Sequence, residues 1–193
     1  MELACSSVTS MRASVFIATS LDGYIARPDG DVGWLDRYNS DPTQDHGFSD
    51  FFASVDCLLM GRKTFEKVLS FGVDWPYAGK HVVVLSHGSI EIPEHLQDVE
   101  SASGAPDQIL GKLSDMGCQH AYVDGGMTIR QFLAAGLIDS LNVTRVPLLL
   151  GDGIPLFSGL SVEIELEHVS TRSMPSGLVQ SQYRVVRDGA EEG

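Results

Sequence analysis

The sequence predicts an α/β fold in which a mixed, mainly parallel central sheet carries helices on both faces and ends in an antiparallel C-terminal edge. Two observations indicate this class. Between residues 12 and 136, short apolar runs that suit buried strands alternate with stretches of helical periodicity, which is the pattern of successive β-α units. After residue 139 the helical stretches stop, and three alternating segments follow, as is typical of antiparallel strands.

The expected elements follow one another in a regular order. Residues 13–18 form a buried first strand, and turn chemistry lies on both sides of residues 24–26. Phe48, Phe51 and Phe52 recur at helical spacing, and we interpret this stripe as core packing. The other helices are expected at residues 64–69, 106–116 and 128–135, and the other strands at residues 56–60, 81–85, 99–101, 121–123, 139–150, 161–170 and 178–187.

Length and composition indicate one globular domain. We expect a loose polar leader at residues 1–11, a domain at residues 12–188 and a tail at residues 189–193. Apolar residues make up 43% of the chain and charged residues 20%, which suits a soluble protein. With 26 acidic residues against 13 basic ones, neither nucleic acid nor an anionic membrane is an expected partner.

The cysteines and the N-terminus indicate a reducing compartment. Cys5, Cys57 and Cys118 match neither a disulfide framework nor a zinc pattern, so no metal is expected, and Cys57 and Cys118 suit the core. We see no signal peptide and no apolar run long enough to span a membrane. The expected location is therefore the cytoplasm.

Three turns rich in glycine, hydroxyl or charged residues follow three of the expected buried strands. They are the 61–64 turn (Gly-Arg-Lys-Thr), the 86–89 turn (Ser-His-Gly-Ser) and the 124–129 turn (Asp-Gly-Gly-Met-Thr-Ile). Ligands of open α/β sheets bind beyond the carboxyl ends of the strands, and helix starts with nearby cations suit phosphate. The spacing of these turns does not match the common nucleotide-binding motifs. The alternative is a set of ordinary strand-to-helix turns with solvated cations.

Five segments carry a resemblance to a known family. They are SLDGYIA at residues 20–26, LMGRKTFE at residues 59–66, VVLS at residues 83–86, DGG at residues 124–126 and PLLLGDGIPLF at residues 147–157. In this order they resemble the dihydrofolate reductase superfamily. Residues 20–23 and 151–157 are most similar to the reductase domain of the bacterial bifunctional deaminase-reductase of riboflavin synthesis. The resemblance covers residues 12–187 and implies a three-layer dihydrofolate reductase-like fold.

The resemblance also implies NADPH as the cofactor. The 61–64 turn would hold the pyrophosphate and the ribose 2′-phosphate, which a guanidinium can grip in a bidentate way. The 86–89 turn would flank the 2′-phosphate and adenine, and the 124–129 turn would donate backbone N–H groups. Trp34 lies in the loop that closes over the nicotinamide in relatives, or it simply anchors that loop. The implied cofactor-binding residues are Ala18, Asp22, Gly23, Trp34, Gly61, Arg62, Lys63, Thr64, Ser86, His87, Gly125, Gly126, Met127, Thr128 and Ile129.

The implied reaction is hydride transfer to a C=N or C=O carbon of a small heterocyclic substrate (pterin, folate or pyrimidine-ribosyl-like) or of a carbonyl compound. Asp45 is the candidate catalytic and substrate-binding acid, with Asp50 nearby, because dihydrofolate reductases place an acid on the helix before the glycine-arginine turn. Alternatively, Asp45 caps the helix that starts near Gly47. Asp124 is expected to face the substrate, whereas Asp22 either touches the ligand or fixes its own turn.

Two departures from the family leave the substrate open. No tryptophan-proline substrate motif follows Trp34, and no set of arginines for a ribose phosphate is evident. The competing hypothesis is a protein that binds NADPH without turnover and acts as a sensor or interaction module. Because an apolar edge strand is hazardous when exposed, we also expect the β-rich C-terminal part to pair in a homodimer.

Overall fold

The protein is described by a computed structural model that covers residues 11–38 and 45–187. Leader residues 1–10, with Cys5, and the tail at residues 189–193 lie outside the described part. The elements are β1 (Arg12–Ser20), β2 (Tyr24–Ala26), the 3-10 helix η1 (Gly33–Tyr38), α1 (Phe48–Ser54), β3 (Cys57–Gly61), α2 (Arg62–Leu69), β4 (His81–Leu85), β5 (Val99–Ala102), α3 (Pro106–Asp115), β6 (His120–Asp124), α4 (Gly126–Ala134), β7 (Ser140–Val146), β8 (Ile154–Pro155), β9 (Leu166–Ser173) and β10 (Val179–Val185).

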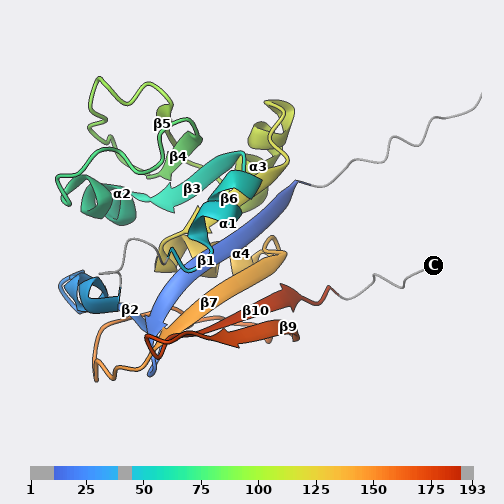
Figure 1. The fold of residues 1–193 in the computed structure, drawn as a ribbon. Helices are drawn as coiled ribbons and strands as arrows, with labels where there is room; N and C mark the ends of the chain where they lie inside the picture. Colours follow the sequence, from blue (N-terminus) through green and yellow to red (C-terminus); the bar gives the residue numbers. More distant parts are fainter. Residues whose placement is uncertain (1–10, 39–44, 188–193) are drawn as a thin grey trace, which may run out of the picture.

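One eight-stranded sheet organises the fold, in the order β5-β4-β3-β6-β1-β7-β10-β9 (Figure 1). The strands from β5 to β7 pair in parallel, whereas β10 is antiparallel to both β7 and β9. A second small sheet pairs β2 with β8. The predicted mixed, mainly parallel sheet with an antiparallel C-terminal edge is confirmed.

The direction of β7 corrects one expectation. We expected residues 139–150 to behave as an antiparallel strand, but β7 runs parallel to β1, with Ser14 opposite Ser140. Helix α4 separates β6 from β7 and returns the chain to the end of the sheet where β1 also begins, which is what a parallel connection requires. The antiparallel part of the sheet therefore begins only at β10.

Alternating side chains of the central strands form two cores, one on each face of the sheet. Cys57 and Leu59 of β3 pack with residues of α3 and α4, whereas Leu58 and Met60 pack with residues of α2. The phenylalanines of α1 lie against this second core. Figure 1 shows α1 in front of the sheet and α4 behind it. The period of two along each buried strand thus produces the predicted three layers.

The aromatic stripe of α1 is core packing, as predicted. Phe48 and Phe51 place their ring centroids 5.5 and 5.0 Å from the ring of Phe16 on β1. Cys57 is buried, Cys118 is half-buried, and both are free thiols. Met11, which we assigned to the leader, is buried in the core of the α3 and α4 face, so the ordered domain includes it.

Candidate functional site

Four neighbouring parallel strands end, on the same side of the sheet, in the three predicted binding turns and in the turn at residues 20–23. In spatial order they are β4, β3, β6 and β1, and Gly61 at the end of β3 lies opposite Leu85 at the end of β4. Met60 lies opposite Asp124 at the end of β6. At about 4.8 Å per strand, the row extends for about 14 Å. Turns that are 20 to 40 residues apart in sequence therefore form one continuous row at the carboxyl ends of these strands.

The 61–64 and 124–129 turns touch each other. Gly125 has φ 91° and ψ 130°, a conformation that only glycine adopts readily. A Cβ atom on Gly125 would collide with the Thr64 hydroxyl, and one on Gly61 would lie 3.1 Å from the Thr128 hydroxyl. The two glycines thus let the starts of α2 and α4 approach closely.

The N-termini of both helices lack side-chain caps. Neither Gly61 before α2 nor Gly125 before α4 supplies a capping hydrogen bond, and neither helix has an acidic residue in its first turn. Uncapped N–H groups and the positive ends of two helix dipoles therefore converge on this edge. This arrangement fits a ligand with phosphate groups, such as a dinucleotide.

The cations of the 61–64 turn are accessible at the surface. Arg62 donates to Glu66 one turn further along α2 at 2.6 Å, and both side chains are about half exposed, at 52% and 51%. Lys63 is exposed. In the 86–89 turn, Ser86 and Gly88 hydrogen-bond to each other, and His87 is exposed beside them. Because β4 adjoins β3 and Gly61 lies opposite Leu85, this turn lies next to the 61–64 turn that contains Arg62.

Asp124 is the acidic group whose surroundings are most unusual. Burial raises the pKa of Asp124 to about 6, although the Gly125 N–H, which donates to its carboxylate at 2.8 Å, opposes the shift. The sequence reasoning missed two neighbours, Tyr77 and Tyr122, which the structure brings close to this carboxyl group. The alternation of side chains along β6 could have indicated Tyr122, because residues two positions apart on a strand lie on the same face, and Tyr122 is two positions before Asp124. No sequence signal indicates Tyr77.

Asp45 caps a helix, as the second of our two interpretations proposed. Its carboxylate accepts hydrogen bonds from the N–H groups of Gly47 and Ser49, both at 2.9 Å. The Ser49 hydroxyl and these N–H groups lower the pKa of Asp45 to about 2. An exposed carboxylate with this pKa is a poor proton donor near neutral pH. Asp50 is also exposed, in the first turn of α1.

Asp22 joins two loops at the edge of the site. Its carboxylate accepts from the N–H groups of Leu150 and Gly151 at 3.1 and 2.8 Å. The Ser20 hydroxyl, together with these N–H groups, lowers the pKa of Asp22 to about 2. Asp22 therefore fixes the loop after β7 to the turn that contains Gly23, rather than its own turn alone.

Trp34 anchors the loop that carries η1. It is only 6% exposed and packs in one cluster with Val146, Leu178 and the half-buried Ala18. Its indole Nε1 is buried and has no hydrogen-bond partner in the described part of the chain. A buried indole N–H is normally paired, so Trp34 is an exception among the described residues.

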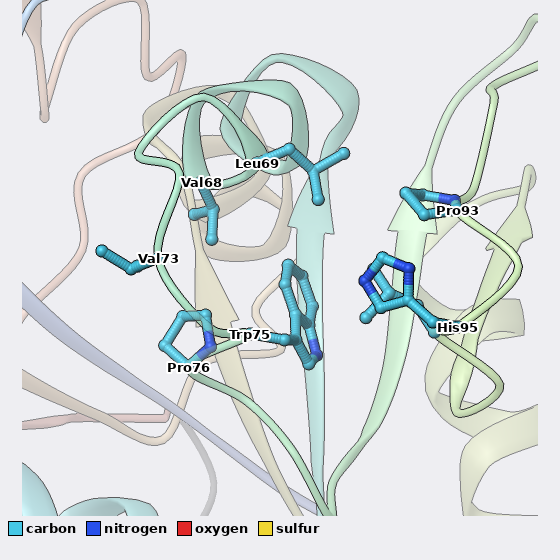
Figure 2. A pocket seen from close by; sticks show the side chains of 8 residues that line it. Val68, Leu69, Val73, Trp75, Pro76, Pro93 and His95 are labelled. Atoms are coloured by element: carbon cyan, nitrogen blue, oxygen red, sulfur yellow. The ribbon is translucent and has the colours of Figure 1, made fainter.

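A separate apolar pocket lies away from these turns. Figure 2 shows Trp75 between Val68 and Leu69, at the end of α2, and Pro93 and His95, in the loop after β4. The 61–64 turn includes the start of α2, whereas this pocket lies at the end of α2. Among residues 11–38 and 45–187, no cluster of three His, Cys, Asp or Glu side chains could hold a metal ion. None of the helices in those residues is long and apolar enough to span a membrane.

Comparison with known proteins identifies the family. Residues 13–180 match the RibD C-terminal domain. Protein YwjB of Bacillus subtilis, which is uncharacterised, is 34% identical over 172 residues, or 88% of this chain and 95% of YwjB. A Shewanella sp. PV-4 protein provisionally assigned to riboflavin biosynthesis is 41% identical, with a TM-score of 0.84 over 92% of this chain and all of that one.

A more distant solved structure shares the fold alone. Dihydrofolate reductase from Enterococcus faecalis, solved in complex with NADP(H), superposes with a TM-score of 0.65 at 18% identity, over 93% of this chain and 98% of the reductase. The fold is therefore dihydrofolate reductase-like, as the resemblance implied. The match over residues 13–180 spans most of the chain, so this protein belongs to the RibD C-terminal domain family, a family of reductases.

Proposed function

We propose that this protein is an NADPH-dependent reductase of a small heterocyclic or carbonyl substrate. The observation that carries the proposal is the contact between the 61–64 and 124–129 turns, where two uncapped helix N-termini meet at the carboxyl edge of the sheet. Two such helix starts, with Arg62 and Lys63 beside them, offer the N–H groups and positive charge that a pyrophosphate needs. Membership of a reductase family supports the same function.

Each turn at the carboxyl ends of the strands has a role in this proposal. The 86–89 turn and Arg62 bind the adenosine and its 2′-phosphate, and the two contacting turns bind the pyrophosphate. Ala18 and Gly23 border the nicotinamide, and Trp34, which packs in one cluster with Ala18, holds the loop beside it. When bound, NADPH supplies a hydride to the electrophilic carbon of a C=N or C=O bond, and the nitrogen or oxygen takes a proton.

We propose Asp124, and not Asp45, as the group that manages this proton. A carboxyl group with a pKa of about 6 is partly protonated near neutral pH, which suits a general acid. Asp45 has a pKa of about 2 and is already occupied as a helix cap. This role agrees with the prediction that Asp124, which precedes Gly125 and Gly126, faces the substrate.

Calorimetric titration of the purified protein with NADPH and NADH tests the cofactor assignment. We expect tighter binding of NADPH, and Arg62→Ala should remove most of that preference by weakening NADPH binding more than NADH binding. Lys112→Ala, an exposed lysine on α3, is the matched control because it removes one positive charge on the opposite face. Equal affinity for the two cofactors in the wild-type protein would refute the roles of Arg62, Ser86 and His87.

Turnover separates the reductase from a protein that only senses NADPH. We expect NADPH oxidation, followed by its absorbance, with at least one of 5-amino-6-(5-phosphoribosylamino)uracil, dihydrofolate or a small carbonyl compound. Binding of NADPH without oxidation in all three assays would favour the sensor hypothesis.

We also propose a homodimer formed through β9. This strand ends the sheet, and within residues 11–38 and 45–187 it pairs with β10 alone. It is exposed along its whole length, including Leu166 at 41% and Val169 at 52%. An unprotected edge of this kind invites pairing with a second copy. Sedimentation velocity should show a dimer, and Val169→Lys should shift the protein toward monomer. A wild-type monomer at micromolar concentration would refute the proposal.

A further inference from the structure

The neighbouring strands β1 and β6 stop pairing before they reach the carboxyl ends where the candidate site lies. Their parallel pairing ends where Ser14 lies opposite Tyr122. The N–H of Arg12 donates to the carbonyl of Gln119, which precedes β6, so the backbone groups of Arg12 face β6. Because every second residue of a strand faces the same neighbour, the backbone of Phe16 also faces β6, beyond the last paired residue. The Phe16 carbonyl therefore needs a donor that the β6 backbone does not supply.

The side chain of Tyr122 supplies this donor. Its hydroxyl donates to the Phe16 carbonyl oxygen at 2.9 Å. Tyr122 is only 5% exposed, and its ring lies edge-on to the rings of Phe48 and Phe51 of α1, with centroids 6.3 and 5.1 Å away. These ring contacts fix the side chain, so the hydroxyl stays beside β1, where the pairing of the two strands has ended.

Asp124 shares this hydroxyl. It is two positions beyond Tyr122 at the carboxyl end of β6, and residues two apart on a strand lie on one face. The Asp124 carboxyl group hydrogen-bonds to the Tyr122 hydroxyl as well as to the Gly125 N–H. Met60, which lies opposite Asp124 on β3, is apolar, and Tyr77 is a second titratable neighbour. Tyr122 and Gly125 thus hold a carboxyl group that is otherwise buried among apolar groups.

The Tyr122 hydroxyl can serve both protonation states of Asp124, because a phenol is a donor and an acceptor. While Asp124 is protonated, its O–H donates to the phenol oxygen, and Tyr122 keeps its hydrogen bond to Phe16. Once Asp124 is ionised, the Tyr122 O–H turns from Phe16 to the carboxylate, and no proton leaves the phenol. Burial and the nearby Asp124 carboxylate raise the pKa of Tyr122, so the phenol stays protonated throughout.

We propose that Tyr122 is a positioning residue for Asp124, and that its hydroxyl holds the carboxyl group in place before and after a proton passes to the substrate. This inference rests on the proposed reductase function, in which Asp124 manages that proton. A hydrogen bond to the ionised carboxylate is charge-assisted and is stronger than one to the neutral acid. The hydroxyl therefore favours release of a proton that burial would otherwise keep on Asp124.

Four variants test this role. Tyr122→Phe removes the hydroxyl and keeps the ring that packs on α1. A fluorinated tyrosine at position 122 keeps the ring and the hydroxyl but makes the hydroxyl a stronger donor. Tyr77→Phe removes a hydroxyl near Asp124 that is not one of its hydrogen-bond partners. Tyr183→Phe is the matched control, because it removes the same atom from a half-buried tyrosine on β10, which β1 and β7 separate from β6.

Two measurements are made over the same pH range. NMR of ligand-free protein with isotope-labelled aspartate follows the Asp124 carboxyl carbon, whose signal is the one that Asp124→Asn removes. The second measurement is kcat/KM for NADPH oxidation with 5-amino-6-(5-phosphoribosylamino)uracil and with dihydrofolate.

Tyr122→Phe should raise the titration midpoint of Asp124 by about 1 pH unit, since the carboxylate loses one charge-assisted hydrogen bond. The fall in kcat/KM should move to higher pH by a similar amount, with the Kd for NADPH nearly unchanged. The fluorinated tyrosine should move the midpoint to lower pH, whereas Tyr77→Phe and Tyr183→Phe should leave it in place. A purely structural role of Tyr122 would lower the melting temperature, through the unpaired Phe16 carbonyl, without moving the midpoint.

The two proposals fail in different ways. If neither change at position 122 moves the Asp124 midpoint, or if Tyr77→Phe moves it as far as Tyr122→Phe, the role of Tyr122 is refuted whatever the activity. If the midpoint moves as expected but kcat/KM does not follow it, or if neither substrate is reduced, Tyr122 positions Asp124 and the proposed reaction fails.

Discussion

Replacing Gly125 with alanine should weaken both the fold and the binding of NADPH. The backbone of Gly125 has φ 91° and ψ 130°, which an L residue adopts only under strain. The added methyl group would also collide with the Thr64 hydroxyl, so the starts of α2 and α4 would have to separate. The perturbation therefore acts directly on the contact that carries the proposed function.

The expected magnitude follows from these two effects. A residue held in a strained backbone conformation costs about 1–3 kcal/mol, and overpacking of a tight contact costs about 1–3 kcal/mol more. We expect the free energy of unfolding to fall by about 3 kcal/mol. If the separated turns lose even one hydrogen bond to the pyrophosphate, the Kd for NADPH should rise by about 10-fold.

Gly136→Ala is the matched control. Gly136 follows α4 with φ 67°, and nothing lies within 4 Å of a Cβ atom built there. This variant introduces backbone strain without a clash and far from the binding turns, so it should cost about 1 kcal/mol and leave the Kd for NADPH unchanged.

Urea denaturation measures the loss of stability, and calorimetry measures the affinity for NADPH. The double variant Gly125→Ala/Thr64→Ala should recover part of the stability, because the colliding hydroxyl is removed. The reasoning is refuted if Gly125→Ala loses no more stability than Gly136→Ala and binds NADPH normally.

The remaining predictions concern three titratable groups. In the wild type, kcat/KM should fall as pH rises through about 6, because the protonated Asp124 carboxyl group is the proposed acid. Asp124→Asn should abolish this fall. An unchanged pH profile in the variant would exclude this role. Asp45→Ala should lower the melting temperature by removing the cap of α1, with kcat nearly unchanged, whereas a large loss of kcat at full stability would restore Asp45 as the catalytic acid. Burial lowers the pKa of His120, so the native state binds fewer protons than the unfolded chain as pH falls below about 6.5, and stability should fall there. His120→Asn should be less stable at pH 7 but should show a flatter loss of stability in acid, measured by urea denaturation between pH 7 and pH 5.

The sequence predicted the fold class because the signals for it are local. The apolar runs at β3, β4 and β6 and the stripe of Phe48, Phe51 and Phe52 report burial through their own periodicity. Turn chemistry likewise indicated the ends of strands, since glycine, serine and aspartate act on the backbone near them. The direction of β7 could not be read in this way, because it depends on where α4 returns the chain.

The same distinction between local signals and contacts made by folding applies to the candidate site. The 61–64 and 124–129 turns are visible in the sequence, but their contact is a property of two strands that are neighbours only in the folded sheet. The role of Asp45 was open between a cap and an acid until its hydrogen bonds to Gly47 and Ser49 were known. Tyr77 carries no motif and was missed, because its closeness to Asp124 exists only in the folded chain.

The sequence by itself determined the order of the β-α units, the three glycine- or hydroxyl-bearing turns and the resemblance to dihydrofolate reductases. Each strand, turn and motif behind these conclusions depends on residues within a few positions of one another. Only the tertiary structure decided that two helix starts converge, that burial raises the pKa of Asp124, and that the buried Trp34 Nε1 has no partner among the described residues. Burial and hydrogen-bond partners come from strands far apart in the chain, so they exist only once the sheet has formed.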